Sequence, residues 1–518
     1  MTKVITAEQA IGLINDCDTV AVGGFVGNMH PEALTRSAED VFLKTGKPAK
    51  LKLIYAAGQG DGKKKGLNHF AHEGMIDTVI GGHWGLAPAL GEMALANKIK
   101  GYNFPQGAIS HLFRSIAGNK PGAITKVGLR TFADPRLEGG KVNSITTEDL
   151  VEVVNLRGEE WLMYHTMPID IAFIRGTYAD EEGNCTFEKE ALSLEMLAMA
   201  QACKNSGGKV ILQVEKIIAK DKLNYSKVKI PNIYVDAIVV AEQSEHMQTF
   251  GEQYNPSYSQ EIRVPVDSIE PLALNERKVI ARRAAMELVP HAVTNLGIGM
   301  PEGVSIVANE EGVEGLVLTT EAGTIGGVPA GGLSFGSATN PDMIIDQPYQ
   351  FDFYDGGGLD VAFLGLAQTD QKGDVNVSKF GPKLAGCGGF INISQNAKKV
   401  VYMGTFTAGG LKVEIKDGQL NILSEGRVKK FIKAVEQVTF SGGYAYEKDQ
   451  PVIYVTERAV FELNAKGLIL TEIAPGVDLK KDILDQMEFE PEILEPLKVM
   501  DKRIYEEGPM GLKIKGGK

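Results

Sequence analysis

The sequence predicts an α/β protein made of two homologous open α/β domains with largely parallel sheets. Short apolar runs rich in β-branched residues alternate with amphipathic segments along the whole chain, as expected of strand–helix units. The landmarks of the first half then return in the same order in the second half. A chain of 518 residues also exceeds the length of roughly 250–300 residues beyond which one core tends to split.

The first half contains the elements of one α/β domain. A capped helix is expected after Thr6, and a strand at 19–22 leads into a glycine-rich turn that includes Gly23 and Gly24. A helix with proline in its first turn should follow at 30–34, because proline fits that position well. Further strands are predicted at 51–55, 170–174 and 209–214, the first of them ending in a turn around Gln59.

The second half repeats these elements. Residues 293–302 mirror the strand, turn and helix start at 20–32, and the strand that ends at Gly323 mirrors the strand that ends at Gly58. In both halves a strand that begins with Asp is followed by a second Asp after ten residues: 170 and 180, then 360 and 370. We therefore predict domains at 1–263 and 275–518, joined by a proline-containing linker at 264–274, with the active site at the domain interface.

Composition limits the classes of function. The formal charge of −12 argues against nucleic acid or an anionic membrane surface as the main partner. Four cysteines without a C-x-x-C pair fit a reducing cytoplasm and give no zinc signature. With no long apolar run and no phosphate-binding G-x-x-x-x-G-K-[ST] motif, we expect a soluble cytoplasmic protein without a metal, a membrane span or a tightly bound cofactor.

The stretch 316–332 is the strongest candidate for a chemical site. A buried strand is predicted to end at Glu321, and a glycine-rich loop follows. A carboxylate at that place needs a partner or a function, and in open α/β sheets ligands bind where strands end. The repeat places Ala56 at the same register in the first half, so the fold itself does not require a carboxylate there. The alternative is a capping or salt-bridged Glu.

Several motifs together resemble the class I (family I) coenzyme A transferases, especially the branch of single-chain acetate or propionate CoA-transferases in which both halves are fused. The motifs are Gly297-Ile298-Gly299-Met300-Pro301, Thr320-Glu321-Ala322-Gly323, Gly373-Asp374-Val375-Asn376, Ala385-Gly386-Cys387-Gly388-Gly389-Phe390 and Gly404-Thr405-Phe406-Thr407-Ala408-Gly409-Gly410. The resemblance covers nearly the whole chain.

The resemblance implies a site for each part of the reaction. Glu321 is the catalytic carboxylate, and Gly388 and Gly389 are the expected oxyanion donors. Gly23, Gly24 and Gln59 would close the side of the site that holds the acyl group or carboxylate. CoA, a substrate here, is expected along Gly297, Ile298, Gly299, Met300, Pro301, Asn376 and Lys379. The family also suggests a homo-oligomer, often a tetramer.

A Glu with an ordinary pKa near ~4.3 is ionised at pH 7, so it needs no general base to act as a nucleophile. We therefore predict CoA transfer between an acyl-CoA and a short-chain acid such as acetate, propionate, lactate or butyrate, through a glutamyl-CoA thioester. The alternatives are an acyl-CoA hydrolase on the same scaffold and a non-catalytic sensor of a CoA ester or sugar phosphate.

Three other groups of charged residues receive ordinary structural interpretations. His69 and His72 lie three residues apart but have no third metal ligand nearby in the sequence. The run 63–65 of three lysines fits a solvated loop better than a phosphate contact. Arg282 and Arg283 are expected on a salt-bridged helix face.

Overall fold

The computed structural model describes residues 3–265 and 270–514, so residues 266–269 of the predicted linker lie outside the described part. Contacts divide the chain into two compact units. Unit 1 comprises Met1–Val264, Thr320–Asp352 and Lys379–Asn392, and unit 2 comprises Pro265–Thr319, Phe353–Ser378 and Ile393–Lys518. Glu321 therefore belongs to unit 1, although it lies in the second half of the sequence; the predicted domain boundaries concern the sequence repeat and stay a prediction.

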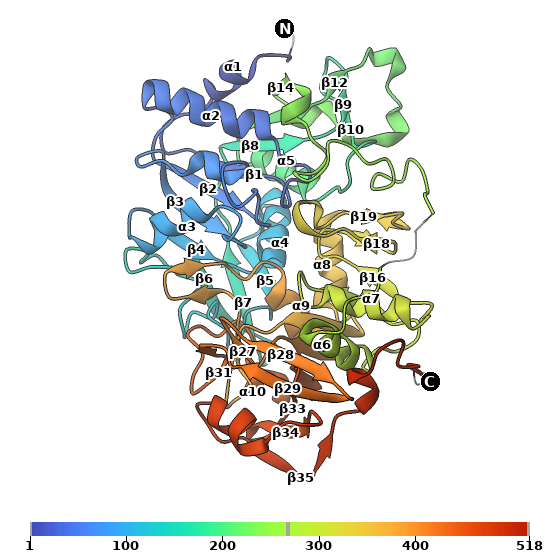
Figure 1. The fold of residues 1–518 in the computed structure, drawn as a ribbon. Coiled ribbons are helices and arrows are strands. Elements are labelled where there is room, and N and C mark those ends of the chain that lie inside the picture. The colour runs from blue at the N-terminus through green and yellow to red at the C-terminus, as the bar shows by residue number, and fades with distance from the viewer. Residues whose placement is uncertain (1–2, 266–269, 515–518) are drawn as a thin grey trace. The chain divides into compact units, whose positions relative to one another are not determined.

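A seven-stranded sheet, in which every pairing is parallel, forms the centre of unit 1 (Figure 1). Its strands are buried almost throughout, which explains why they read as continuous apolar runs in the sequence. In spatial order they are β14 (Ala237–Val240), β11 (Lys209–Val214), β8 (Ile171–Arg175), β1 (Thr19–Val22), β2 (Leu51–Tyr55), β3 (Ile76–Gly81) and β4 (Lys100–Asn103).

Helices complete the core of unit 1. One face of the sheet packs on an apolar cluster supplied by α1 (Ala7–Ile11), α2 (Glu32–Thr45), the 3₁₀ helix η1 (Leu67–Phe70) and α3 (Pro88–Leu95). Helix α5 (Met196–Asn205) packs against β8, β11 and α4 (Gln106–Ala117). The predicted cap of α1 is confirmed, because Thr6 and Gln9 form a reciprocal capping box.

Smaller elements surround this sheet. An antiparallel sheet joins β5 (Gly122–Thr125), β7 (Glu159–His165) and β6 (Val151–Leu156), and a second joins β12 (Lys216–Ile217), β9 (Tyr178–Ala179), β10 (Cys185–Thr186) and β13 (Val228–Ile230). The later segments of unit 1 add β17 (Thr324–Ile325), β18 (Val328–Pro329), β19 (Ala338–Thr339), β20 (Met343–Ile344), β24 (Lys379–Phe380), β25 (Lys383–Leu384) and the starts of α8 (Gln347–Asp355) and α9 (Phe390–Asn396).

Unit 2 has a parallel run of strands, which two antiparallel pairings and then one more parallel pairing extend. The parallel strands, in spatial order, are β16 (Val317–Thr319), β15 (Val293–Leu296), β21 (Val361–Gly365), β26 (Val400–Met403) and β32 (Val452–Val455). Next to β32 lie β33 (Ala459–Asn464), β34 (Gly467–Ile473) and β35 (Glu492–Val499). The other elements are α6 (Glu276–Ala285), α7 (Glu302–Glu310), α10 (Gly442–Glu447), β22 (Gln368–Asp370), β23 (Val375–Asn376), β27 (Thr407–Ala408), β28 (Lys412–Lys416), β29 (Gln419–Ser424), β30 (Val428–Lys429) and β31 (Phe431–Ile432).

The two units share a strand order. Unit 1 contains the order β11-β8-β1-β2, and unit 2 contains β26-β21-β15-β16. The backbone N–H of Thr19 donates to the Asp170 carboxylate at 2.8 Å, and that of Val293 donates to the Asp360 carboxylate at 2.9 Å. The repeated Asp of the sequence therefore ties together the starts of two neighbouring strands in each unit.

This shared hydrogen bond fixes the equivalence of positions. Thr19 of β1 pairs with Lys52 of β2, and Val293 of β15 pairs with Val317 of β16. Counting four residues onward from Lys52 and from Val317 reaches Ala56 and Glu321. The register of the strands thus agrees with the sequence comparison: the position that holds a buried Ala in one copy holds a carboxylate in the other.

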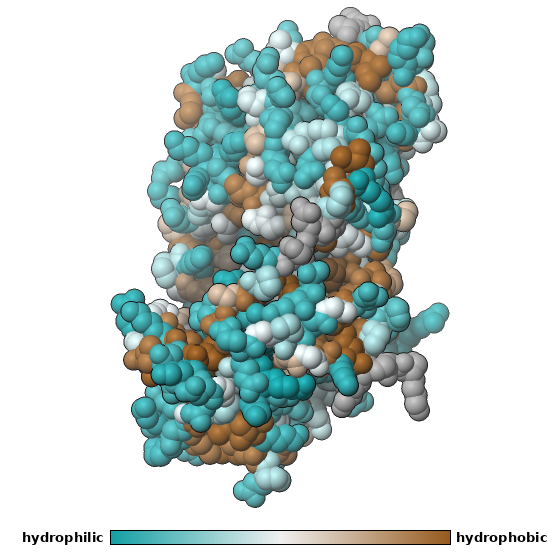
Figure 2. Space-filling model, turned by 45° about the vertical axis from the view of Figure 1, so that its right-hand side comes forward, coloured by the Kyte–Doolittle hydropathy of each residue, from teal (hydrophilic) through white to brown (hydrophobic). Residues whose placement is uncertain are grey.

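One face of the molecule shows how polar and apolar residues are distributed on its surface. Hydrophilic residues cover most of the face seen in Figure 2, interrupted by scattered apolar patches. Within residues 3–265 and 270–514, no helix has the length and apolar character needed to cross a membrane.

Candidate functional site

Glu321 lies in a tight turn directly after the sheet of unit 2 ends. The backbone N–H of Thr320 donates to the carbonyl of Thr324 at 3.0 Å, and that of Gly323 donates back to Thr320 at 3.1 Å. Gly323 has a φ of +114°, which favours glycine. The Gln350 amide of α8 donates to the Thr320 carbonyl at 3.0 Å. Hydrogen bonds therefore hold the turn on both sides of Glu321, and Glu321 itself is half-buried.

The loop after β1 lies beside this turn. The rings of Phe25 and Phe335 are 5.7 Å apart, and the Asn28 amide donates to both of their carbonyls at 3.0 Å. A Cβ placed on Gly336 would lie 2.6 Å from the Phe25 ring and 3.4 Å from Cβ of Ala322, the neighbour of Glu321. The structure thus brings the predicted glycine turn at 23–27 close to the Glu321 turn.

Gln59 is fixed next to the same glycine turn. Its amide nitrogen donates to the Val22 carbonyl at 2.9 Å, and its amide oxygen lies 2.7 Å from Nδ1 of His30. A Cβ on Gly24 would lie 2.6 Å from the Gln59 oxygen, so only glycine leaves room for the amide there. Gly24 and Gln59 therefore pack together beside Gly23; the predicted role of these residues toward a substrate stays a prediction.

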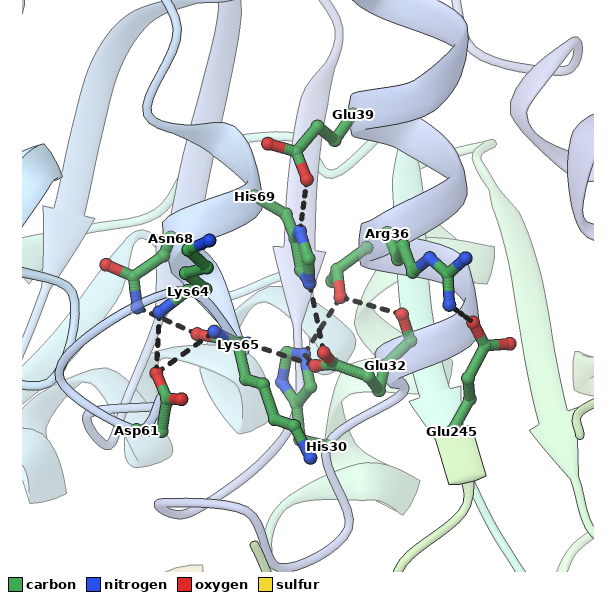
Figure 3. A network of polar contacts seen from close by, with 12 residues as sticks. His30, Glu32, Arg36, Glu39, Asp61, Lys64, Lys65, Asn68, His69 and Glu245 are labelled. Atoms are coloured by element: carbon green, nitrogen blue, oxygen red, sulfur yellow. Dashed lines mark hydrogen bonds and ion pairs between the residues drawn. The ribbon is translucent and has the colours of Figure 1, made fainter. Parts of the chain in front are cut away.

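His30, which contacts Gln59, also belongs to a network of carboxylates and imidazoles that Figure 3 shows. The His69 imidazole bridges two carboxylates: its Nε2 lies 3.0 Å from Glu32 and its Nδ1 lies 2.5 Å from Glu39. Burial by itself lowers the pKa of His69, but the two carboxylates together outweigh burial and raise it. His30, 3.4 Å from Glu32, has its pKa lowered to about 4 by burial and is neutral. The network therefore joins α2 to η1 and reaches Gln59 through His30.

The glycine loop at 386–389 packs against the residues that follow β3. The backbone N–H groups of Trp84 and Gly85 donate to the Ala385 carbonyl at 2.7 and 2.9 Å. The Gly388 N–H donates to the Gly82 carbonyl at 2.7 Å, so it is already engaged. For Gly389 no such backbone bond is found among the described residues. Of the two predicted oxyanion donors, Gly389 is therefore the one with an N–H group left for a ligand.

Comparison with known proteins identifies the family. Residues 4–241 match a family model described as coenzyme A transferase. A caffeate CoA-transferase from Acetobacterium woodii is 48% identical over 525 residues, covering 100% of both chains. The acetate CoA-transferase YdiF of Escherichia coli (strain K12) is 44% identical, covering 98% of this chain and 96% of its own. This chain belongs to the coenzyme A transferase family.

Solved structures of the family agree with the fold. The apoenzyme of the acyl-CoA transferase YdiF from Escherichia coli O157:H7 superposes with a TM-score of 0.95 at 43% identity, covering 100% of this chain and 98% of that one. A second structure of YdiF, described as a thioester complex with CoA, gives a TM-score of 0.94 over the same shares. The α/β class with large parallel sheets predicted for this transferase is therefore confirmed.

The predicted CoA contacts of the transferase fall in both units. Gly297 to Pro301 form the loop between β15 and α7 in unit 2, where the Gly297 N–H donates to the Phe363 carbonyl at 2.9 Å and Ile298 is 59% exposed. Asn376, also in unit 2, is fully buried and donates to Gln368 at 2.7 Å. Lys379 belongs to unit 1. CoA binding by these residues stays a prediction.

The other singled-out residues of the transferase have structural partners. His72 pairs with Glu39 at 2.6 Å, and no group of side chains suited to a metal occurs within the described ranges. Lys63 and Lys64 are exposed, as expected of a solvated loop. Arg283 pairs with Glu287 and Glu472. The fully buried Arg282 lies 3.7 Å from Glu310 and also donates to main-chain carbonyls of residues 504 and 506.

Sequence reasoning missed a buried polar chain near the glycine loop of the transferase. The backbone N–H of Gln106 donates to the Gly388 carbonyl, and its side chain donates to Gln347 at 3.0 Å. Gln347 in turn donates to Glu195 at 2.8 Å. Burial, with a smaller contribution from Asp346, raises the pKa of Glu195 to about 8. No local motif identifies these residues, because the chain of hydrogen bonds joins segments far apart in the sequence.

Proposed function

We propose that this coenzyme A transferase moves CoA between an acyl-CoA and a short-chain carboxylic acid through covalent intermediates on Glu321. One observation carries the proposal. Glu321 is a half-buried carboxylate in a braced turn, at a position where the repeat of the same fold has the buried Ala56. Packing of this fold does not require a carboxylate at that position, and partly burying one has a desolvation cost, so its presence favours a chemical role.

The chemistry proceeds without a general base. The Glu321 carboxylate attacks the acyl-CoA carbonyl, and the bond to sulfur breaks to give an acyl-glutamyl anhydride and CoA thiolate. The thiolate then attacks the glutamyl carbonyl and releases the donor acid as its carboxylate, leaving a glutamyl-CoA thioester. An incoming carboxylate reverses both steps and leaves as the new acyl-CoA. One thioester is exchanged for another, so the overall step needs no added energy source.

Each tetrahedral intermediate carries a negative oxygen that needs preorganised donors. The N–H of Gly389, near the Gln106 segment, suits this role, while Gly388 holds the loop through its bond to Gly82. Removing one such donor typically lowers the rate by about 10²–10³-fold. Gly23, Gly24 and Gln59 are proposed for the side of the site that holds the acyl group, and Gly297, Ile298, Gly299, Met300, Pro301, Asn376 and Lys379 for CoA.

The identity of the acid is a further part of the proposal. Two relatives carry the names of different acids, acetate and caffeate. Small residues flank the catalytic turn, including Ala322 and Ala330, and suit an acid of the acetate, propionate, lactate or butyrate type. We also propose a cytoplasmic homo-oligomer, a tetramer by family resemblance, which light scattering on the purified protein tests.

Mass spectrometry tests the covalent mechanism. The protein is incubated with acetyl-CoA or propionyl-CoA and no acceptor acid, and the peptide that contains Glu321 is analysed. A CoA adduct on Glu321 supports the proposal. Rapid release of free acid without an adduct identifies a hydrolase, and the absence of any reaction with either ester favours a non-catalytic sensor; both results contradict it.

A further inference from the structure

His83 lies between the two glycine segments of the proposed site. It follows β3 in the segment that binds the 385–388 loop. A Cβ placed on Gly58 would lie 2.4 Å from Nδ1 of His83, and a Cβ on Gly388 would lie 3.8 Å from its Cδ2. The imidazole therefore fills the space between the turn that carries Gln59 and the loop that carries Gly389. Both of these segments and Glu321 belong to unit 1.

The two ring nitrogens of His83 have different surroundings. Nδ1 is buried and has no hydrogen-bond partner among the described residues. Nε2 likewise bonds to no described residue, but it is not one of the buried atoms, so it lies at an accessible edge of this half-buried side chain. The ring therefore has one enclosed nitrogen beside Gly58 and one nitrogen that a ligand can reach.

The protonation state of His83 determines which hydrogen bonds its imidazole ring can donate or accept. Burial lowers the pKa of His83 to about 4, so the imidazole is neutral at physiological pH and carries a single N–H. The Nε2–H tautomer leaves only a lone pair facing Gly58 and directs the proton to the accessible edge. A base with so low a pKa is poorly suited to activating water, whereas a neutral N–H is well suited to donating a hydrogen bond.

We propose that His83 is a further catalytic residue, whose Nε2–H donates a hydrogen bond to an oxygen of the small carboxylic acid and of its acyl intermediates. The inference rests on the proposed function, because it assumes that the acid binds between the Gln59 turn and the Gly389 loop beside Glu321. It gives the neutral imidazole the task of orienting the carboxylate and stabilising the negative oxygen that forms during each attack.

Gly58 gives an independent indication that the ring position matters. Its φ is not among the positive values, so backbone conformation does not require glycine there. Contact with the His83 ring does require it, because a Cβ at Gly58 would overlap Nδ1. The Gly58→Ala variant therefore displaces the imidazole without changing its chemistry. We expect it to impair acid exchange in the same way as removal of the ring.

Three substitutions of His83 distinguish hydrogen-bond donation by Nε2–H from the packing of the ring. His83→Gln places an amide nitrogen near the position of Nε2, His83→Asn places it near Nδ1, and His83→Leu removes the donor. We expect His83→Leu to lower kcat/KM for acetate by about 10²-fold. His83→Gln should recover most of that loss, and His83→Asn should not. Thermal unfolding of each variant, and the dissociation constant for CoA, should stay close to those of the parent protein.

The outcomes decide the inference separately from the proposed function. Parent-like kinetics of His83→Leu, equal losses in the Leu and Gln variants, or rescue by Asn would each overturn it. If the variants fail to fold, the ¹⁵N resonance of His83 Nε2 in the parent protein provides the test: it should shift when acetate is added, and an unchanged resonance contradicts the contact. Absence of a Glu321 adduct in the parent protein would instead contradict the proposed function.

Discussion

Ala56 and Glu321 occupy the same register position in two sheets with the same strand order. The equivalence follows from Thr19 and Val293, which begin matching strands and donate to matching aspartates. A fully buried methyl group in one copy thus corresponds to a half-buried carboxylate in the other. Because both copies build the same sheet, this difference is what supports the proposed chemical role of Glu321.

Replacing Glu321 tests that conclusion directly. Glu321→Ala removes the nucleophile, so CoA exchange should fall by at least about 10³-fold while CoA binding remains. The measurements are steady-state exchange between acetyl-CoA and propionate, and calorimetric titration with CoA. The exposed Glu314 precedes strand β16, whereas Glu321 follows it, and Glu314 gives a matched control: Glu314→Ala should exchange CoA like the parent protein. Retained exchange in Glu321→Ala would refute the role of Glu321 as nucleophile.

Adding a methyl group at Gly24 should disturb the Gln59 amide. Gly24 has a φ of +150°, and its Cβ would lie 2.6 Å from the Gln59 oxygen. Gly24→Ala should raise KM for the acceptor acid about 10-fold or more, because Gln59 must move, and destabilise the fold by about 1–3 kcal/mol. Gly46→Ala is the control, since Gly46 has a φ of +72° but open space around its Cβ. A similar KM change in both variants would mean that backbone strain, not Gln59, is responsible.

The His69 bridge predicts a stability that depends on pH. Its pKa is raised in the folded protein, against the effect of burial, by Glu32 and Glu39, with His72 and His30 as the other titratable neighbours. A raised histidine pKa contributes stability that is complete below the unfolded value near 6.5 and is lost as pH rises through the folded value.

The matched variants are His69→Gln and His165→Gln. The melting temperature of the parent should exceed that of His69→Gln most at about pH 6, by an amount that corresponds to about 2–4 kcal/mol, and the difference should shrink toward pH 9. His165 forms only a surface pair with Glu152, so its substitution should change little at any pH. A difference for His69→Gln that grows with pH would contradict the assignment of charge.

Glu195 predicts a dependence of the same sign from a different cause, the burial of a carboxyl group. Its folded pKa is raised to about 8, chiefly by burial, so it is protonated in the fold and ionised in the unfolded chain at neutral pH. The unfolded state therefore binds fewer protons, and stability falls as pH rises from about 4.5 to about 8. Glu195→Gln should match the parent at pH 5 and melt at a higher temperature at pH 8.5.

A control keeps the Glu195 measurement interpretable. Glu181→Gln removes one exposed carboxylate from the same unit and should leave the pH dependence of the parent unchanged. Differential scanning fluorimetry at pH 5, 7 and 8.5 is sufficient for the comparison. If Glu195→Gln is less stable than the parent at pH 8.5, Glu195 is ionised in the fold and the buried chain through Gln347 and Gln106 holds a charge.

The sequence by itself determined the class of fold, the repeat and the main candidate residue. Buried parallel strands leave long apolar runs, and a Pro or a capping Thr marks where a helix starts, so strands β1, β2 and β11 and helix α1 were predicted at the residues where they occur. The repeat was readable because each copy needs the same aspartate to join two strands. Glu321 stood out because its counterpart is Ala56.

Only the tertiary structure decided which groups meet at the glycine loop 386–389. His83, Gln106, Gln347 and Glu195 come from separate segments, and nothing in their local sequence distinguishes them from surface residues. The hydrogen bond from Gly388 to Gly82, which makes Gly389 the better candidate for the proposed oxyanion donor, likewise depends on two loops meeting. Periodicity reports whether a side chain faces a core, but a hydrogen bond between distant segments, and the pKa shift that burial causes, exist only once the chain has folded.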